Sequence, residues 1–149
     1  MEKIFKTNNA IDTIDLGERI GSLLNISDVI LLTGDLSAGK TTLTKGIGKA
    51  LGVKSIINSP TFTIVKEYHG RIPLYHLDLY RLNGLNNDFD LEEFIGGDGV
   101  CVIEWPYQVK DLLPEEYLKV DITRLNLEER KIEISAYGKH YEELLEVLK

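Results

Sequence analysis

Residues 34–41 have the types and spacing of a loop that binds phosphate groups. The pattern G-x-x-x-x-G-K-[ST] is matched at every fixed position by Gly34-Asp35-Leu36-Ser37-Ala38-Gly39-Lys40-Thr41. In such a loop the glycines let backbone N–H groups approach the phosphates, and the following helix N-terminus adds partial positive charge. The lysine can reach the outer phosphates, and the threonine hydroxyl can face Mg²⁺. We therefore expect a nucleotide site here.

The segments on either side of the loop agree with this hypothesis. The apolar run 29–32 precedes it and is typical of a buried strand. A helix is predicted over 42–51, because apolar residues recur there at helical spacing and Gly52 follows as a helix-ending residue. A plain strand-to-helix turn is the alternative interpretation. Strand, glycine loop and helix in this order favour the nucleotide site.

Glu104 is a candidate Mg²⁺ ligand. It directly follows the apolar run 100–103, which is the layout of a Walker B strand with Glu where Asp is usual. A carboxylate at this position can hold Mg²⁺ directly or through water. The alternative is a solvent-facing carboxylate at the end of a strand. Trp105 comes next and is the only tryptophan, so it lies either beside the site or in the core.

Asp78 is a candidate for the hydrolytic step. It lies in a predicted strand over 72–80, where a period of two places it on the same face as His76 and Tyr80. A carboxylate near the phosphates can orient or deprotonate the attacking water. The alternative is a structural partner for His76 or Arg81. His76 itself is interpreted as a hydrogen-bonded structural residue rather than a metal ligand.

Thr61 belongs to the segment Ser59-Pro60-Thr61-Phe62, which begins a strand predicted over 61–68. Pro60 restricts the backbone of this loop, and the Thr61 hydroxyl could meet Mg²⁺ or the γ-phosphate. Loops of this kind are ordered by the γ-phosphate in other P-loop hydrolases. A simple turn explains the local pattern equally well.

The rest of the chain predicts the elements that position these residues. Two consecutive segments, 117–122 and 131–137, alternate apolar and polar residues and predict an antiparallel pair with one wet face. Gly17 and Gly21 suggest that their helix packs closely against the sheet. Further strands are predicted at 4–6 and 100–103, with helices from Asn8 or Asn9 to Leu24, at 90–97 and at 141–148. We predict a single α/β domain over 1–149, P-loop NTPase-like, with a mainly parallel central sheet extended by antiparallel strands and helices on both faces.

Composition limits the function classes. The formal net charge of −7 and the lack of a Lys/Arg cluster argue against direct nucleic-acid binding, so a tRNA or DNA substrate would be reached through a partner. Cys101 is the only cysteine, and its expected place is a buried strand. No apolar stretch has the length of a signal peptide core or a membrane span. We expect a cytoplasmic protein without membrane contact.

Four segments together resemble the TsaE family, bacterial ATPases of the tRNA threonylcarbamoyladenosine machinery. The resemblance covers nearly the whole chain and rests on Gly34-Asp35-Leu36-Ser37-Ala38-Gly39-Lys40-Thr41-Thr42, Ser59-Pro60-Thr61-Phe62, His76-Leu77-Asp78-Leu79-Tyr80-Arg81-Leu82 and Ile103-Glu104-Trp105-Pro106. One position departs from the family's usual Gly-Ala-Gly-Lys-Thr, since Ser37 replaces its first glycine. The general loop pattern leaves that position free, so we expect binding to persist with a modest effect on affinity.

The resemblance implies an ATP hydrolase that uses ATP and Mg²⁺. Thr41 and Glu104 would hold the metal, and Asp78, Glu104 and Lys40 would serve catalysis. By the same resemblance, the nucleotide would contact Asp35, Leu36, Ser37, Ala38, Gly39, Lys40, Thr41, Thr42, Thr61 and Trp105. The Asn8-Asn9 stretch is a candidate for adenine contacts.

The resemblance also implies partners. They are the subunit that transfers threonylcarbamoyl to tRNA adenosine and its regulatory paralogue, with ATP hydrolysis resetting the complex between turnovers. Two alternatives stay open from the residues alone. One is a nucleotide-dependent interaction module without useful turnover, and the other is a small P-loop kinase, against which the chain is short and lacks an Arg-rich lid segment.

Overall fold

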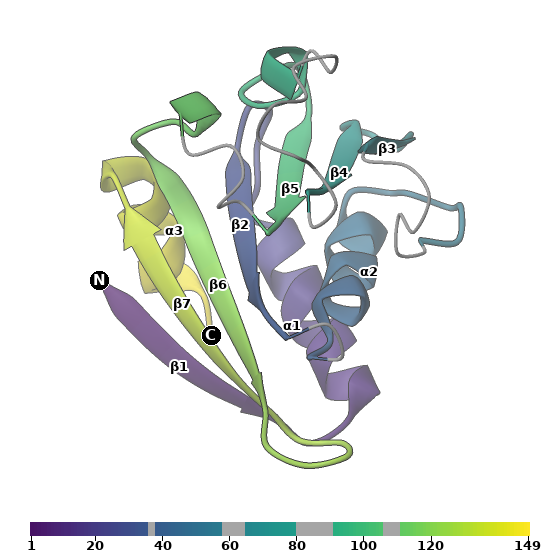
Figure 1. The fold of residues 1–149 in the computed structure, drawn as a ribbon, viewed down its shortest axis with the longest axis vertical. Helices are drawn as coiled ribbons and strands as arrows, with labels where there is room; N and C mark the ends of the chain where they lie inside the picture. The colour runs from purple at the N-terminus through teal and green to yellow at the C-terminus, as the bar shows by residue number, and fades with distance from the viewer. Residues whose placement is uncertain (36–37, 58–64, 80–90, 106–110) are drawn as a thin grey trace.

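The computed structural model describes residues 1–35, 38–57, 65–79, 91–105 and 111–149. Its described strands form a seven-stranded sheet in the order β1-β7-β6-β2-β5-β4-β3 (Figure 1). The strands are β1 Glu2–Thr7, β2 Val29–Gly34, β3 Val65–Tyr68, β4 Leu74–Asp78, β5 Val100–Glu104, β6 Tyr117–Arg124 and β7 Arg130–Tyr137. The helices are α1 Ala10–Gly21, α2 Lys40–Ala50 and α3 Lys139–Val147, with a 3₁₀ turn, η1, at Leu91–Glu93.

The centre of the sheet is parallel, as expected. Strands β6, β2, β5 and β4 run in one direction, and β7, β1 and β3 add antiparallel pairings at the two sides. The carboxyl ends of the parallel strands therefore meet at one edge, where α/β sheets bind ligands. Asp78 and Glu104 are direct neighbours in the register of β4 and β5 at this edge.

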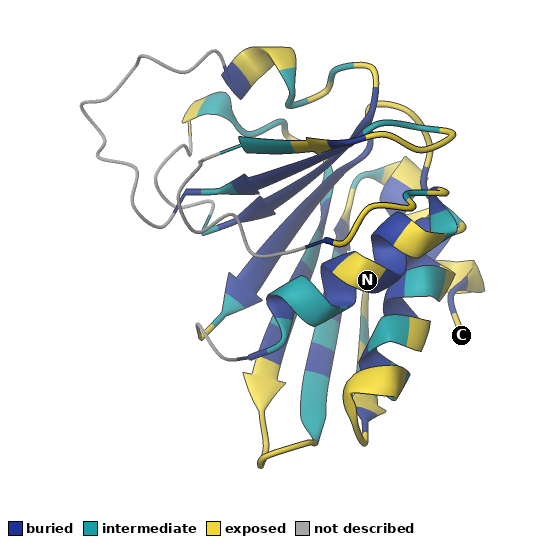
Figure 2. Cartoon of the chain, turned by 90° about the vertical axis from the view of Figure 1, so that its right-hand side faces the viewer, coloured by how far each residue is buried: buried dark blue, intermediate teal, exposed yellow. Residues whose placement is uncertain are grey.

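The two faces of the sheet are covered differently. All three α-helices contribute to one apolar cluster with alternate residues of the strands, such as Ile30 and Leu32 of β2. The other two, Val29 and Leu31, face a second cluster that includes Leu91 of η1 and the flanking Phe94. Helical segments thus cover both faces, but the second face carries only a 3₁₀ turn. The central strands are buried from both sides (Figure 2).

Helices α1 and α2 are in backbone contact, and this corrects the expected role of the α1 glycines. An ideal Cβ on Gly17 would lie 2.2 Å from the Leu43 carbonyl oxygen, and one on Gly46 would lie 2.0 Å from the Ile14 oxygen. Gly21 likewise faces α2, where Ala50 lies 2.8 Å from its ideal Cβ. These glycines therefore pack against the neighbouring helix, not against the sheet.

Several element boundaries differ from the prediction. Asn9 caps α1 by accepting from the Asp12 N–H at 2.9 Å, as expected. The helix ends at Gly21 rather than at residue 24. The apolar spacing continues beyond that end because Leu24 is buried even though it lies after the helix. The helix expected at 90–97 is only the turn η1, and residue 90 lies outside the described residues.

The predicted antiparallel pair is confirmed. Strands β6 and β7 pair in register, and their inward residues Leu118, Val120 and Ile134 are buried while the alternate residues are less so. Cys101 is buried in β5, and burial raises the pKa of its thiol. None of the helices in the described ranges has the length and apolarity needed to cross a bilayer.

Candidate active site

Gly34 and Gly39, at the two ends of the loop between β2 and α2, have backbone conformations that only glycine adopts readily. Gly34 has φ of +136° and Gly39 has φ of +108°. An ideal Cβ on Gly34 would lie 2.4 Å from the Ile122 carbonyl oxygen of β6. Gly39 is the N-cap of α2 and supplies no side-chain acceptor, so it leaves the first-turn N–H groups of α2 without a side-chain cap. This geometry suits an anionic ligand at the helix N-terminus.

Lys40 extends from the start of α2 back across this loop. Its side chain is 4% exposed, and Nζ donates to the Gly34 carbonyl at 2.9 Å. The same Nζ lies 4.0 Å from Glu104 Oε1 and 4.0 Å from the centroid of the Trp105 ring. Burial lowers the pKa of Lys40, while the charges of Glu104, Asp78 and Asp35 oppose that shift. The ammonium therefore lies among carboxylates at the loop.

Glu104 is buried at 3% exposure, so the solvent-facing interpretation of this carboxylate is wrong. Its Oε2 contacts Nε2 of His76, which is fully buried on β4. Because a carboxylate only accepts hydrogen bonds, we infer that Nε2 is the donor. This contact supports the structural interpretation of His76, and it leaves Oε1 of Glu104 on the side of Lys40.

Asp78 occupies the predicted place at the carboxyl end of β4. Its strand neighbour is Glu104, and the Leu79 N–H donates to the Glu104 carbonyl at 3.1 Å. The alternation along β4 places Asp78 and His76 on the helix-covered face, while Tyr75 and Leu77 enter the opposite cluster. Two carboxylates from adjacent strands thus end on the same edge and face as Lys40.

The remaining predicted residues fall into two groups. Trp105 is half-buried with φ of +58°, and its ring lies against Lys40, so its place is at the site. Thr41 and Thr42 lie in the first turn of α2 and are half-buried, Asp35 is exposed and Ala38 is buried. Leu36, Ser37, Thr61, Tyr80 and Arg81 lie outside the described residues.

The structure also brings two unpredicted residues to the loop, both from the β6–β7 side. Arg130 at the start of β7 donates from Nε to the Ala38 carbonyl at 2.8 Å. Asp121 of β6 accepts from the Thr33 hydroxyl at 2.7 Å, just before the loop. Neither residue shows a motif in the sequence. Only the pairing of β6 with β2 brings the hairpin next to the loop.

The residues present fit a Mg²⁺ ion that accompanies a nucleotide. Among the described residues, no group of three or more His, Cys, Asp or Glu side chains could hold a metal. Mg²⁺ at a nucleotide site usually takes one or two protein ligands, with phosphate oxygens and water completing its shell. Thr41 at the start of α2 and the Lys40-facing oxygen of Glu104 could supply such a pair.

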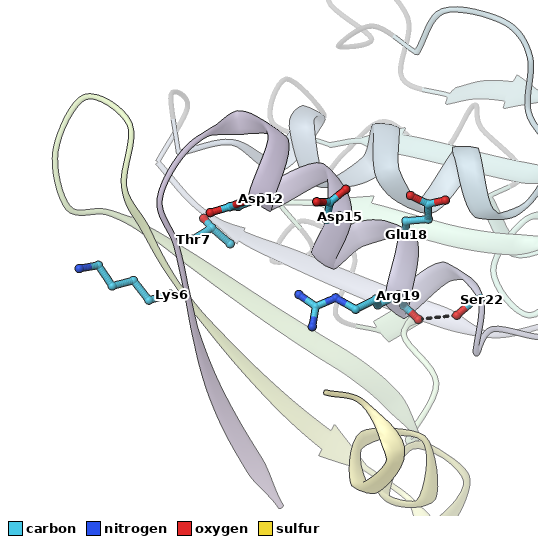
Figure 3. A pocket seen from close by; sticks show the side chains of 7 residues that line it. All are labelled: Lys6, Thr7, Asp12, Asp15, Glu18, Arg19 and Ser22. Carbon is cyan, nitrogen blue, oxygen red and sulfur yellow. Dashed lines mark hydrogen bonds between the residues drawn. The ribbon is translucent and has the colours of Figure 1, made fainter.

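A separate groove of about 680 Å³ runs between β1 and α1 (Figure 3). Its charged lining includes three carboxylates along one side of α1, which does not suit phosphate. The lining residues are Lys6, Thr7, Asp12, Asp15, Glu18, Arg19 and Ser22. Nearby, Asn9 uses its side-chain oxygen to cap α1, and Asn8 is exposed.

Comparison with known proteins decides the family. A family model described as threonylcarbamoyl adenosine biosynthesis protein TsaE matches residues 7–132. The chain belongs to the TsaE family. This confirms the resemblance carried by the four segments, and it places the chain in a family of tRNA threonylcarbamoyladenosine biosynthesis.

Members of the TsaE family match this chain over most of its length. The tRNA threonylcarbamoyladenosine biosynthesis protein TsaE of Bacillus subtilis is 43% identical over 145 residues, covering 97% of this chain and 92% of the relative. The protein of the same description from Treponema pallidum is 42% identical over 131 residues, with 87% and 97% covered. A crystal structure of Bacillus subtilis YdiB is similar with a TM-score of 0.88 and 39% identity, covering 99% of this chain and 94% of that one. The P-loop NTPase-like fold is thereby confirmed.

Proposed function

We propose that this chain is a Mg²⁺-dependent ATP hydrolase that supports threonylcarbamoyl modification of the tRNA adenosine next to the anticodon. One observation carries the proposal. Lys40, Glu104 and Asp78 come from three separate elements and meet beside a glycine loop at one edge of the sheet. Such a cation between carboxylates at a helix N-terminus suits a triphosphate with a divalent ion.

Each residue has a distinct chemical role in this proposal. The loop N–H groups and Lys40 bind the phosphates. To do so, the Lys40 ammonium replaces its hydrogen bond to the Gly34 carbonyl with one to a phosphate oxygen. Thr41 and Glu104 hold Mg²⁺, which supplies positive charge to the phosphate oxygens when bound. His76 fixes the orientation of the Glu104 carboxylate. Asp78 orients or deprotonates the attacking water.

We further propose that hydrolysis serves a complex. The family belongs to the threonylcarbamoyladenosine machinery, and the proposed partners are the threonylcarbamoyl-transferase subunit and its regulatory paralogue. Hydrolysis would reset that complex between turnovers. The net charge of −7 supports contact with tRNA only through the partners.

The test is to measure ATP binding and turnover with Mg²⁺, alone and with the two partner subunits. Turnover that is weak alone and rises in the complex is the expected result. ATP binding without turnover under any condition would instead identify a nucleotide-dependent interaction module. Transfer of the γ-phosphate to a small molecule rather than to water would identify a kinase.

The partners themselves can be tested by a pull-down from cell lysate with and without ATP. Recovery of the threonylcarbamoyl-transferase subunit is the expected result. A Lys40→Ala variant is the matched control, because it should lose the nucleotide while its surface stays almost unchanged, given the 4% exposure of that side chain.

A further inference from the structure

Arg130 connects two loops that lie far apart in the sequence. Its Nε donates to the Ala38 carbonyl of the phosphate loop at 2.8 Å. Its Nη1 donates to the carbonyls of Asn126 and Glu129, each at 2.9 Å, and more weakly to that of Leu127 at 3.3 Å. All of these acceptors are backbone carbonyls. The guanidinium fork thus bridges the phosphate loop and the turn between β6 and β7.

The turn that Arg130 contacts is held in place by its own hydrogen bonds. Asn126 Oδ1 accepts from the N–H groups of Glu128 and Glu129 at 3.1 and 2.9 Å. The Leu125 N–H donates to the Glu129 carbonyl at 3.0 Å. Lys6 of β1 pairs with the Glu129 carboxylate at 2.9 Å. The turn is therefore a fixed anchor, and Arg130 connects the phosphate loop to it.

The bond to the Ala38 carbonyl determines the orientation of the peptide group that joins Ala38 to Gly39. In a planar trans peptide, the C=O of one residue and the N–H of the next point in opposite directions. The Ala38 carbonyl points to Arg130, so the Gly39 N–H points away from it. Residue 39 can adopt this conformation, with φ of +108°, because it is a glycine.

We propose that Arg130 is a positioning residue that holds the Ala38 carbonyl and thereby turns the Gly39 N–H toward bound phosphate. The nature of the ligand rests on the proposed function, and the position of Arg130 rests on the geometry alone. Because its Nε and Nη1 donors are engaged by backbone carbonyls at 2.8 to 2.9 Å, Arg130 acts from a fixed place in this proposal and does not move onto the γ-phosphate.

The proposal is tested by calorimetry of Mg·ATP and Mg·ADP with the full chain. Arg130→Gln should weaken the binding of both nucleotides roughly tenfold, since the Gly39 N–H is no longer held in the orientation that donates a hydrogen bond to phosphate. Arg130→Lys should weaken them comparably, because one ammonium cannot reproduce the fork. Wild-type affinity in Arg130→Gln, or full affinity in Arg130→Lys, would overturn the positioning role.

Lys6→Gln is the matched control. It removes one positive charge beside the same turn, because Lys6 of β1 pairs with Glu129, and the Lys6 side chain is 59% exposed. Nucleotide affinity should stay within about twofold, because an exposed ion pair contributes little. A tenfold loss in this control would mean that charge or turn stability explains the effect of Arg130, and the positioning role would be overturned.

A measurement on the wild-type protein covers the case in which the Arg130 variants fail to fold. In ¹H–¹⁵N spectra titrated with Mg·ADP, the Gly39 amide signal should move downfield while the Arg130 Nε–H signal persists. A Gly39 signal that does not move on saturation would overturn the proposal.

The same titrations separate this proposal from the proposed function. If the wild-type protein binds neither nucleotide, the proposed function fails. The other case is that the wild-type protein binds both nucleotides, Lys40→Ala binds neither, and Arg130→Gln binds them with wild-type affinity. The nucleotide site then stands, and only the positioning role of Arg130 is wrong.

Discussion

The two sides of the phosphate loop are built from different kinds of groups. On the β4–β5 side, the loop meets ionisable side chains, with Lys40 close to Glu104 and Asp78 on the adjacent strand. On the β6–β7 side, it meets a backbone carbonyl and two charged side chains, Arg130 and Asp121, that are held in hydrogen bonds within the protein. The Ile122 carbonyl leaves no room for a Cβ at Gly34, and Arg130 holds the Ala38 carbonyl.

This difference separates chemistry from positioning. Burial lowers the pKa of Lys40, and the charges of the nearby carboxylates oppose that shift. A negative ligand at the loop would be attracted by the charge of Lys40, whereas Arg130 and Asp121 on the β6–β7 side are already engaged in hydrogen bonds within the protein. Preorganised sites need both parts, because charges stabilise a transition state only where the backbone holds them in place.

The largest expected effect is on turnover, from Asp78→Asn on the β4–β5 side. We expect ATP binding to persist while turnover falls roughly 100-fold or more, because the amide cannot act as a base toward water. Turnover is measured with saturating ATP, and the exposed Asp111→Asn serves as the control. Unchanged turnover in Asp78→Asn would remove this residue from the mechanism.

Lys40→Ala should weaken Mg·ATP binding about 100-fold, because charge-assisted bonds to phosphate are among the strongest that a side chain makes. Isothermal titration calorimetry measures the affinity, and circular dichroism checks that the variant is folded. If the affinity equals that of the wild type, the loop does not bind phosphate through this lysine.

Removal of Mg²⁺ should weaken ATP binding about tenfold, since Glu104 and Asp78 then repel the triphosphate without a cation between them. The measurement is calorimetry with excess chelator. In Glu104→Gln the chelator should have a smaller effect, because one of the repelling charges is gone. An affinity that chelation leaves unchanged contradicts this arrangement.

The smallest expected effect is on the β6–β7 side, from Thr33→Val. This change removes the 2.7 Å bond to Asp121, and the free energy of unfolding should fall by about 1 kcal/mol. Turnover of the folded variant should match the wild type, because Thr33 positions the backbone and performs no chemistry. Denaturant unfolding measures the first quantity, and the exposed Thr123→Val is the control. A large loss of turnover without a loss of stability would contradict the separation of the two sides.

Local patterns in the sequence predicted much of this molecule. The phosphate loop could be recognised in the sequence because its motif occupies the consecutive residues 34–41. The alternation of apolar and polar residues predicted the pairing of β6 with β7. The place of Asp78 followed from the period of two in a strand. Boundaries were less predictable. The apolar spacing of α1 continues past the end of the helix, because Leu24 is buried although it lies outside the helix.

Other features could not be predicted because they depend on contacts between distant segments. Gly17 and Gly21 indicated close packing, but their spacing did not reveal that the neighbour is α2 rather than the sheet. His76 was expected to have a hydrogen-bonding partner, and the parallel pairing of β4 with β5 made that partner Glu104.

The sequence by itself determined the phosphate loop and the strand-end carboxylates, because each depends on residues that are neighbours or nearly so along the chain. Only the tertiary structure decided the burial of Glu104 and the bond from Arg130 to Ala38. Residues 38 and 130 are brought together by the order of the strands in the sheet, and no local pattern records that order.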